Sequence, residues 1–178
     1  MANSNSPYGF RLYGRLVPGT GTVAVTPGAA AGGTYSSSGP IPIASATALT
    51  IGDPIRVSAG LGYLCGVTGA IYGICNSPVP NFGETTTAKH YPEIIPADDQ
   101  TIWQIQAKTG VIVSQGYIGV ASKAYWMGGT TSGYKTIDLS HTTNGTLRVI
   151  GFAPGTTQKA SCAELLVIIN RGAFYGAS

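Results

Sequence analysis

Short runs of apolar and β-branched residues, separated by Gly, Pro, Asn or Asp, recur along most of this chain. The clearest run is 101–107, in which Trp103, Ile105 and Ala107 alternate with two glutamines. Alternation with a period of two predicts a strand with one face buried and the other in water. Further short strands are expected where β-prone runs are bounded by turn residues, at 55–58, 62–67, 70–75, 111–114 and 117–121.

The C-terminal third carries the strongest turn signal in the chain. Asn144 and Gly145 both tolerate a positive φ, which the two central residues of a type I′ turn require. We therefore expect strands near 134–140 and 146–152 to pair with each other across this turn. The last expected strand, 163–169, is a nearly continuous apolar run, which is typical of a strand buried on both faces.

No stretch of the chain shows a helical period, and glycines and β-branched residues are spread throughout. These patterns predict an all-β fold, an antiparallel barrel or sandwich, over residues 49–178. Residues 18–48 consist mainly of small and turn-forming residues, which offer few large side chains to offset the entropy lost on ordering. We predict an extended N-terminal arm and low-complexity loop over 1–48, either a plain flexible leader or a segment that orders on a partner.

Charged residues are scarce, at 10% of the chain, whereas soluble domains average about 25%. A surface with so little charge repulsion suits a protein that packs into an assembly. The net charge is +3, and the basic residues form no block, which disfavours nucleic-acid binding. The longest aliphatic run, 165–169, is too short to cross a bilayer, and the first ten residues contain no apolar signal core. We therefore expect neither a membrane span nor export.

The cysteines predict neither a disulfide framework nor a metal site. Cys65, Cys75 and Cys162 are odd in number and do not form the close pairs of a zinc site. We expect them to be small buried apolar residues of a protein made in a reducing cytoplasm.

Residue types that commonly act in catalysis are few in this chain, and they are scattered along it. His90 and His141 lie in no recognisable catalytic context, and we interpret them as surface or edge-strand residues. The only acidic pair, Asp98-Asp99, precedes a predicted strand and is explained by turn formation. No phosphate-binding loop is present. The sequence therefore predicts a protein that is not an enzyme and holds no cofactor or metal.

Several motifs, in order along the chain, resemble one known family. The opening MANSNSPYGFRLYGRL is similar to the start of the structural cement (head decoration) proteins of tailed bacteriophages. The segment IGDPI at 51–55 resembles their Gly-Asp-Pro-Val element. ADDQTIWQIQA resembles their acidic pair and following strand, with Gln100 in place of a usual Pro and Trp103 where Phe is common. The remaining matches, also in family order, are CGVTGAIYGIC, HYP, YKTIDLS, LRVIGF and AELLVIIN.

This resemblance implies an auxiliary capsid protein, made in the bacterial host cytoplasm and located on the outer surface of the virion. Copies would bind a shell of HK97-fold major capsid protein, as homotrimers or alternatively as homodimers. The N-terminal arm would be the capsid grip. Apolar contact would come from Tyr8, Phe10, Leu12 and Tyr13, and pairing with capsid carboxylates from Arg11 and Arg15. The alternative left open is that these aromatic residues fold back onto their own domain.

A second function remains open at this point: a virion-surface module that recognises carbohydrate or a host receptor. Such a module needs a pocket with two or more exposed aromatic residues beside Asn, Asp or Gln. The adjacent Tyr125 and Trp126, just before two glycines, form the aromatic cluster best suited to that role or to an interface with another protein.

Overall fold

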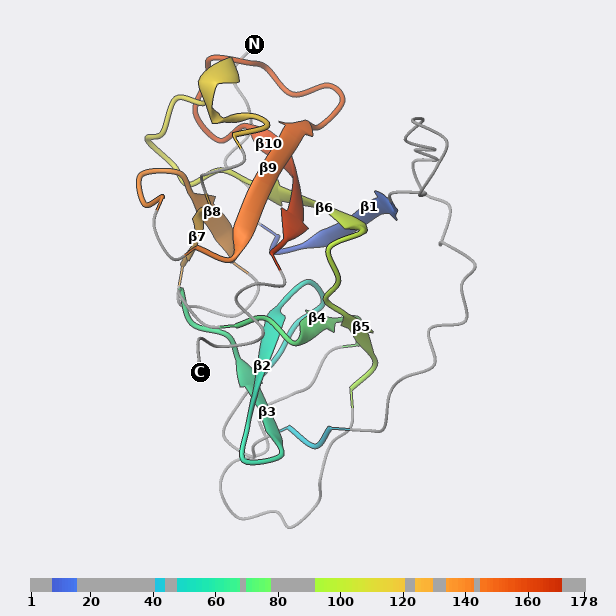
Figure 1. Ribbon diagram of the computed structural model, residues 1–178. Coiled ribbons are helices and arrows are strands. Elements are labelled where there is room, and N and C mark those ends of the chain that lie inside the picture. The colour runs from blue at the N-terminus through green and yellow to red at the C-terminus, as the bar shows by residue number, and fades with distance from the viewer. Residues whose placement is uncertain are drawn as a thin grey trace.

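The computed structural model describes residues 8–15, 41–43, 48–67, 70–77, 92–120, 124–129, 134–142 and 145–170. Within these ranges the chain forms short β-strands and a single three-residue 3₁₀ turn (Figure 1). All ladders between the strands are antiparallel, which confirms the predicted all-β class. The elements are β1 (Arg11–Arg15), β2 (Pro54–Ser58), β3 (Leu61–Leu64), β4 (Gly73–Cys75), β5 (Ile94–Pro96), β6 (Thr101–Gln106), η1 (Gln115–Tyr117), β7 (Trp126–Gly128), β8 (Thr136–Asp138), β9 (Leu147–Phe152) and β10 (Glu164–Ile169).

The first sheet has the strand order β1-β6-β10-β9. The strand predicted at 101–107 is present as β6, but both of its faces are covered rather than one. Ile102 and Gln106, on the face that was expected to meet water, are 0% and 2% exposed. The strand predicted at 163–169 is β10, in which buried and half-buried residues alternate instead of burial on both faces. The pattern of apolar residues therefore predicted the positions of both strands correctly. It did not predict their burial, which depends on what packs against each face of the sheet.

The second sheet has the order β3-β2-β4-β5 and confirms strands within 55–58, 62–67 and 70–75. β2 and β3 form a hairpin that extends away from the first sheet in the lower part of Figure 1. Its two-residue turn is Ala59-Gly60, and both residues have positive φ, at 49° and 77°. Two positive values match the type I′ turn, whose twist suits a two-residue hairpin.

The predicted pairing across Asn144-Gly145 is wrong. β8 pairs with β7, and β9 pairs with β10. Asn144 lies outside the described residues. Gly145 is needed for close packing, because a Cβ there would collide with the backbone of Ala124 and Tyr125. The amide N–H groups of Thr146 and Leu147 donate to the Tyr125 carbonyl, so this segment continues into β9 beside an earlier part of the chain.

The predicted strands at 111–114 and 117–121 are also absent from the described residues. The N–H of Tyr117 donates to the Ser114 carbonyl and that of Ile118 to the Gln115 carbonyl. The bonds to distant parts of the chain are isolated ones, from the Gly119 N–H to Val149 and from the Lys159 N–H to Val113, and they form no ladder. Apolar side chains from this loop still pack on the main core, and Val113 is fully buried. β-prone composition here reflects burial of a loop rather than sheet pairing.

One large core joins the two sheets and the β7–β8 pair. It contains Trp103 and Leu165 from the first sheet, Ile74 from the second, and Met127 and Ile137 from β7 and β8. The three cysteines are buried and free, as predicted. Burial raises the pKa values of Cys65 and Cys75 to about 11, with hydrogen bonds and nearby charges as smaller effects.

Candidate functional site

The N-terminal segment from residue 8 is attached to the domain at a contact between two glycines. Gly9 and Gly52 both have positive φ, and a Cβ on either would overlap the backbone of the facing segment. The close approach lets the Phe10 N–H donate to the Gly52 carbonyl at 2.9 Å. Phe10 is then 2% exposed and packs edge-on against Trp103, with ring centroids 6.1 Å apart. Of the candidate grip residues, Phe10 therefore folds back onto its own domain.

The next residues form an edge strand of the first sheet. β1 pairs with β6, with Arg11 opposite Gln104 and Arg15 opposite Thr101. The register shifts between Leu12 and Gly14, so Tyr13 occupies a β-bulge. Within the predicted arm, residues 11–15 are thus part of the sheet. Most of 16–48 lies outside the described residues.

Two side chains of this segment form its exposed part. The Arg11 guanidinium lies 3.4 Å from the centroid of the Tyr8 ring, a cation–π arrangement, and Arg11 is exposed. Tyr8 is half-buried, and burial, followed by the charge of Glu164, raises its pKa to about 12 despite the opposing effect of Arg11. The Tyr8 ring is therefore neutral at physiological pH, and the guanidinium lies over it while the Arg11 side chain remains exposed. Leu12 packs partly on the core, and Tyr13 is half-buried.

The two candidate interface aromatics lie in different environments. Tyr125 is 1% exposed and belongs to the core, so it does not form part of a surface. Its hydroxyl donates to the Tyr117 carbonyl at 3.3 Å, and burial raises its pKa. Trp126 is half-buried and stacks on the His141 imidazole, with centroids 4.4 Å apart and planes 10° from parallel. On that side the indole face is covered by a neighbouring ring.

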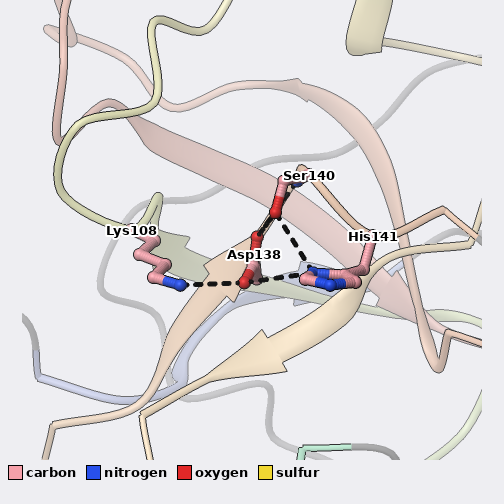
Figure 2. Close-up of polar contacts among 4 residues, drawn as sticks. All are labelled: Lys108, Asp138, Ser140 and His141. Carbon is pink, nitrogen blue, oxygen red and sulfur yellow. Dashed lines mark hydrogen bonds and ion pairs between the residues drawn. The ribbon is translucent and has the colours of Figure 1, made fainter.

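Next to this stack lies a polar cluster centred on Asp138 (Figure 2). The carboxylate accepts hydrogen bonds from the Ser140 N–H at 3.0 Å, from the Ser140 hydroxyl, and from Lys108 Nζ at 3.0 Å. His141 Nδ1 lies 3.4 Å from the same carboxylate and 3.1 Å from Ser140 Oγ. Burial alone would raise the pKa of Asp138, but these hydrogen bonds and the Lys108 charge outweigh it and lower the pKa to about 2.

The cluster contains the residue types of a catalytic serine site, but its hydrogen bonds are those that stabilise a turn. In a catalytic triad one histidine nitrogen faces the serine and the other faces the carboxylate. Here the Ser140 hydroxyl donates to Asp138, and the same His141 nitrogen, Nδ1, faces both groups. The carboxylate therefore stabilises the turn after β8. Asp98 acts in the same way before β6, because it accepts the N–H groups of Gln100 and Thr101 at 3.0 and 2.5 Å.

His141 is exposed, as the sequence predicted, and His90 lies outside the described residues. No group of three His, Cys, Asp or Glu side chains suited to a metal is found within the described ranges. Among the same residues there is also no helix with the length and apolar character that spanning a membrane requires.

One residue that the sequence analysis missed is a buried lysine. Lys135 is 1% exposed, and its Nζ donates to the carbonyls of Cys65 at 3.1 Å and Gly129 at 2.8 Å. Burial lowers its pKa, although Asp53, which is also fully buried, favours the charged form. Lys135 therefore links β8 to the chain that follows β3. Its only sequence signal is its position immediately before the short strand β8, which is too common a placement to identify a buried charge.

Comparisons with protein-family models, with curated proteins and with solved structures gave no match.

Proposed function

We propose that this protein is an auxiliary capsid protein, a cement or decoration protein that binds the outer surface of a tailed-phage head and stabilises the major capsid protein shell. The resemblance of its motifs, in order along the chain, to that family supports the proposal. The barrel or sandwich architecture and the homo-oligomeric state that the family implies belong to the same proposal.

The observation that carries the proposal is the exposed Arg11 guanidinium held over the Tyr8 ring at an edge of the first sheet. A guanidinium positioned in this way can bind a carboxylate through two parallel hydrogen bonds and loses little side-chain entropy on binding. In a chain with so few charged residues, a preorganised cation of this kind is suited to recognition of another protein. Many copies on one shell would make modest individual contacts effective together.

Physically, such a protein would act by adding contacts between neighbouring capsid subunits, all of which must break before the shell ruptures. No transformation of a small molecule is needed. The described geometry agrees with this role in one respect, since the Ser140–His141–Asp138 cluster is arranged as a turn and not as a nucleophile with its base.

The test uses heads of the phage that encodes the chain, purified without this protein and in the expanded state. Binding is measured by co-sedimentation, and cryo-EM of the reconstituted particle shows whether density appears on the outer shell. Absence of outer-shell density at saturating protein would overturn the proposed function.

The role of Arg11 is tested in the same assay by Arg11→Glu, which leaves Phe10 and the strand pairing in place. The matched control is Lys159→Glu, an exposed charge reversal in the loop before β10. We expect Arg11→Glu to weaken binding at least about tenfold, the effect of removing one charge-assisted contact and adding a repulsive one. Equal binding by the two variants would show that Arg11 is not a contact residue, even if the protein does bind heads.

A further inference from the structure

An unpaired strand edge exposes backbone donors and acceptors that can pair with another chain, and folded proteins usually protect such edges. Most sheet edges in the described residues are protected. β1 carries a bulge and an exposed arginine, and β5 ends at Pro96. The outer edges of four other strands make backbone contacts with neighbouring segments. Ile43 contacts β3, Val67 contacts β7, Ala107 contacts β8, and Gly119 and Tyr125 contact β9. The distal half of β2 is the exception.

Within the described part of the chain, β2 has a partner on its outer side only at its base. It pairs there with β4 through Pro54 and Ile55, and the Tyr72 N–H donates to the Ile55 carbonyl. Beyond Ile55, residues 56–58 of β2 are all exposed. Among the described residues no backbone group bonds to this edge. The exposed side chain at its centre is Val57, at 39%.

The hairpin register shows which way the backbone groups of Val57 point. In an antiparallel ladder, residues alternate between pairs that bond to each other and pairs whose N–H and C=O groups point outward. Val57 lies opposite Gly62, and the Gly62 N–H donates outward, to the Pro42 carbonyl at 2.8 Å. The Val57–Gly62 pair is therefore of the second kind. The N–H and C=O of Val57 both point to the open side of β2.

From this geometry we infer that two copies of this chain pair through their β2 edges, antiparallel and about a two-fold axis at Val57. In that arrangement each Val57 N–H donates to the other Val57 carbonyl, and the two side chains meet on one face. On the other face Arg56 lies opposite Ser58 of the other copy, so no like charges face each other. The sheets of the two copies would join into one continuous sheet across the axis.

A second copy is favoured over an unrelated partner because the edge is self-complementary in this register. A charged side chain on an edge strand usually disfavours pairing with another chain. Here the Arg56 guanidinium lies 5.4 Å from the ring centroid of Tyr63, its partner across the hairpin, so it is turned toward β3 and not toward the open edge. An edge that pairs with itself produces a two-fold dimer and not a trimer. The inference selects the homodimer over the homotrimer and gives its interface, and it does not depend on binding to a capsid.

The first experiment is analytical ultracentrifugation of the full chain over a concentration series. We expect a reversible monomer–dimer equilibrium for the wild type. Val57→Pro removes an outward-facing donor but no hydrogen bond of the hairpin, because the Val57 N–H is not bonded within it, and proline is tolerated on such edges. We expect this variant to be monomeric over the same series. A dimer that persists in Val57→Pro, a trimer, or a monomer at every concentration of wild type would overturn the inference.

The second experiment tests the register by disulfide formation with oxidised glutathione. Directly opposed residues in a bonded antiparallel pair have Cα atoms about 5.5 Å apart, which is within disulfide range. Val57→Cys should therefore dimerise covalently at least about tenfold faster than Ile112→Cys, an exposed control that is not on this edge. A mixture of Arg56→Cys and Ser58→Cys should cross-link faster than either variant alone. The native cysteines are buried and should not contribute. Equal rates for Val57→Cys and Ile112→Cys would overturn the pairing.

Discussion

The environment of Phe10 distinguishes an N-terminal segment that packs on the domain from one that is free to contact a capsid. The Phe10→Ala change removes a ring that is 2% exposed and packs edge-on against Trp103. Truncation of a buried Phe costs about 3–5 kcal/mol, of which an edge-to-face aromatic contact contributes about 0.5–1.5 kcal/mol beyond its buried area. A domain with a total stability of about 5–15 kcal/mol would lose a large share of it.

The measurement is urea unfolding followed by circular dichroism and Trp fluorescence. With a slope of roughly 2 kcal/mol per molar urea, the unfolding midpoint should fall by about 2 M. Phe10→Leu, which keeps an apolar side chain, should cost less than about 1.5 kcal/mol, and Ile112→Ala at an exposed position should stay within about 0.5 kcal/mol of wild type.

A loss below about 1 kcal/mol in Phe10→Ala would refute the docking of this segment. If the same variant unfolded like wild type but no longer bound heads, the ring would be a capsid contact and not a core residue. The two readouts together thus separate the two interpretations that the sequence left open.

Three further outcomes are expected. Trp103→Phe should change the free energy of unfolding by no more than about 1 kcal/mol, because the buried indole N–H has no hydrogen-bond partner among the described residues and its removal offsets the lost volume; urea unfolding measures this. Asp138 has a pKa of about 2 in the fold and 3.8 in the unfolded chain, so its stabilisation is complete above pH 4 and is lost as the pH falls toward 2. Relative to Asp138→Asn, wild type should lose about 2 kcal/mol over that interval in acid titrations of stability, and parallel titration curves would contradict this. Lys135→Met should cost about 2–4 kcal/mol in thermal or urea unfolding, because two buried carbonyls lose their donor, and a neutral effect would show that water or relaxation satisfies them.

Much of the strand content could be predicted from local pattern. The alternation at 101–107 and the apolar run at 163–169 located β6 and β10 because the side-chain period of a strand is a property of a few consecutive residues. The turn at Asp98 and the burial of the cysteines also follow from residue chemistry alone. Arg11 was a candidate contact residue because of the family resemblance, and its exposure agrees with the rule that arginine is seldom fully buried.

Strand pairing was not predictable in the same way. Asn144-Gly145 is the stronger hairpin signal, yet the two-residue turn with two positive φ values is Ala59-Gly60, where an alanine adopts the left-handed conformation. Alanine there is disfavoured locally and is tolerated because the β2 and β3 register leaves two residues to close the hairpin. Gly145 is instead required because a Cβ there would collide with the backbone of Ala124 and Tyr125. The residues next to Gly145 in the sequence give no sign of that contact.

The sequence by itself determined the all-β class, the positions of the main strands and the scarcity of charge. Only the tertiary structure decided which strands pair, that Phe10 and Tyr125 are internal, that Lys135 is buried, and that the backbone groups of Val57 face outward. The physical reason is that propensity and periodicity act over a few bonds, whereas pairing and burial depend on contacts between residues far apart in the chain. Such contacts, including any with a second copy, are fixed by the free energy of the whole fold.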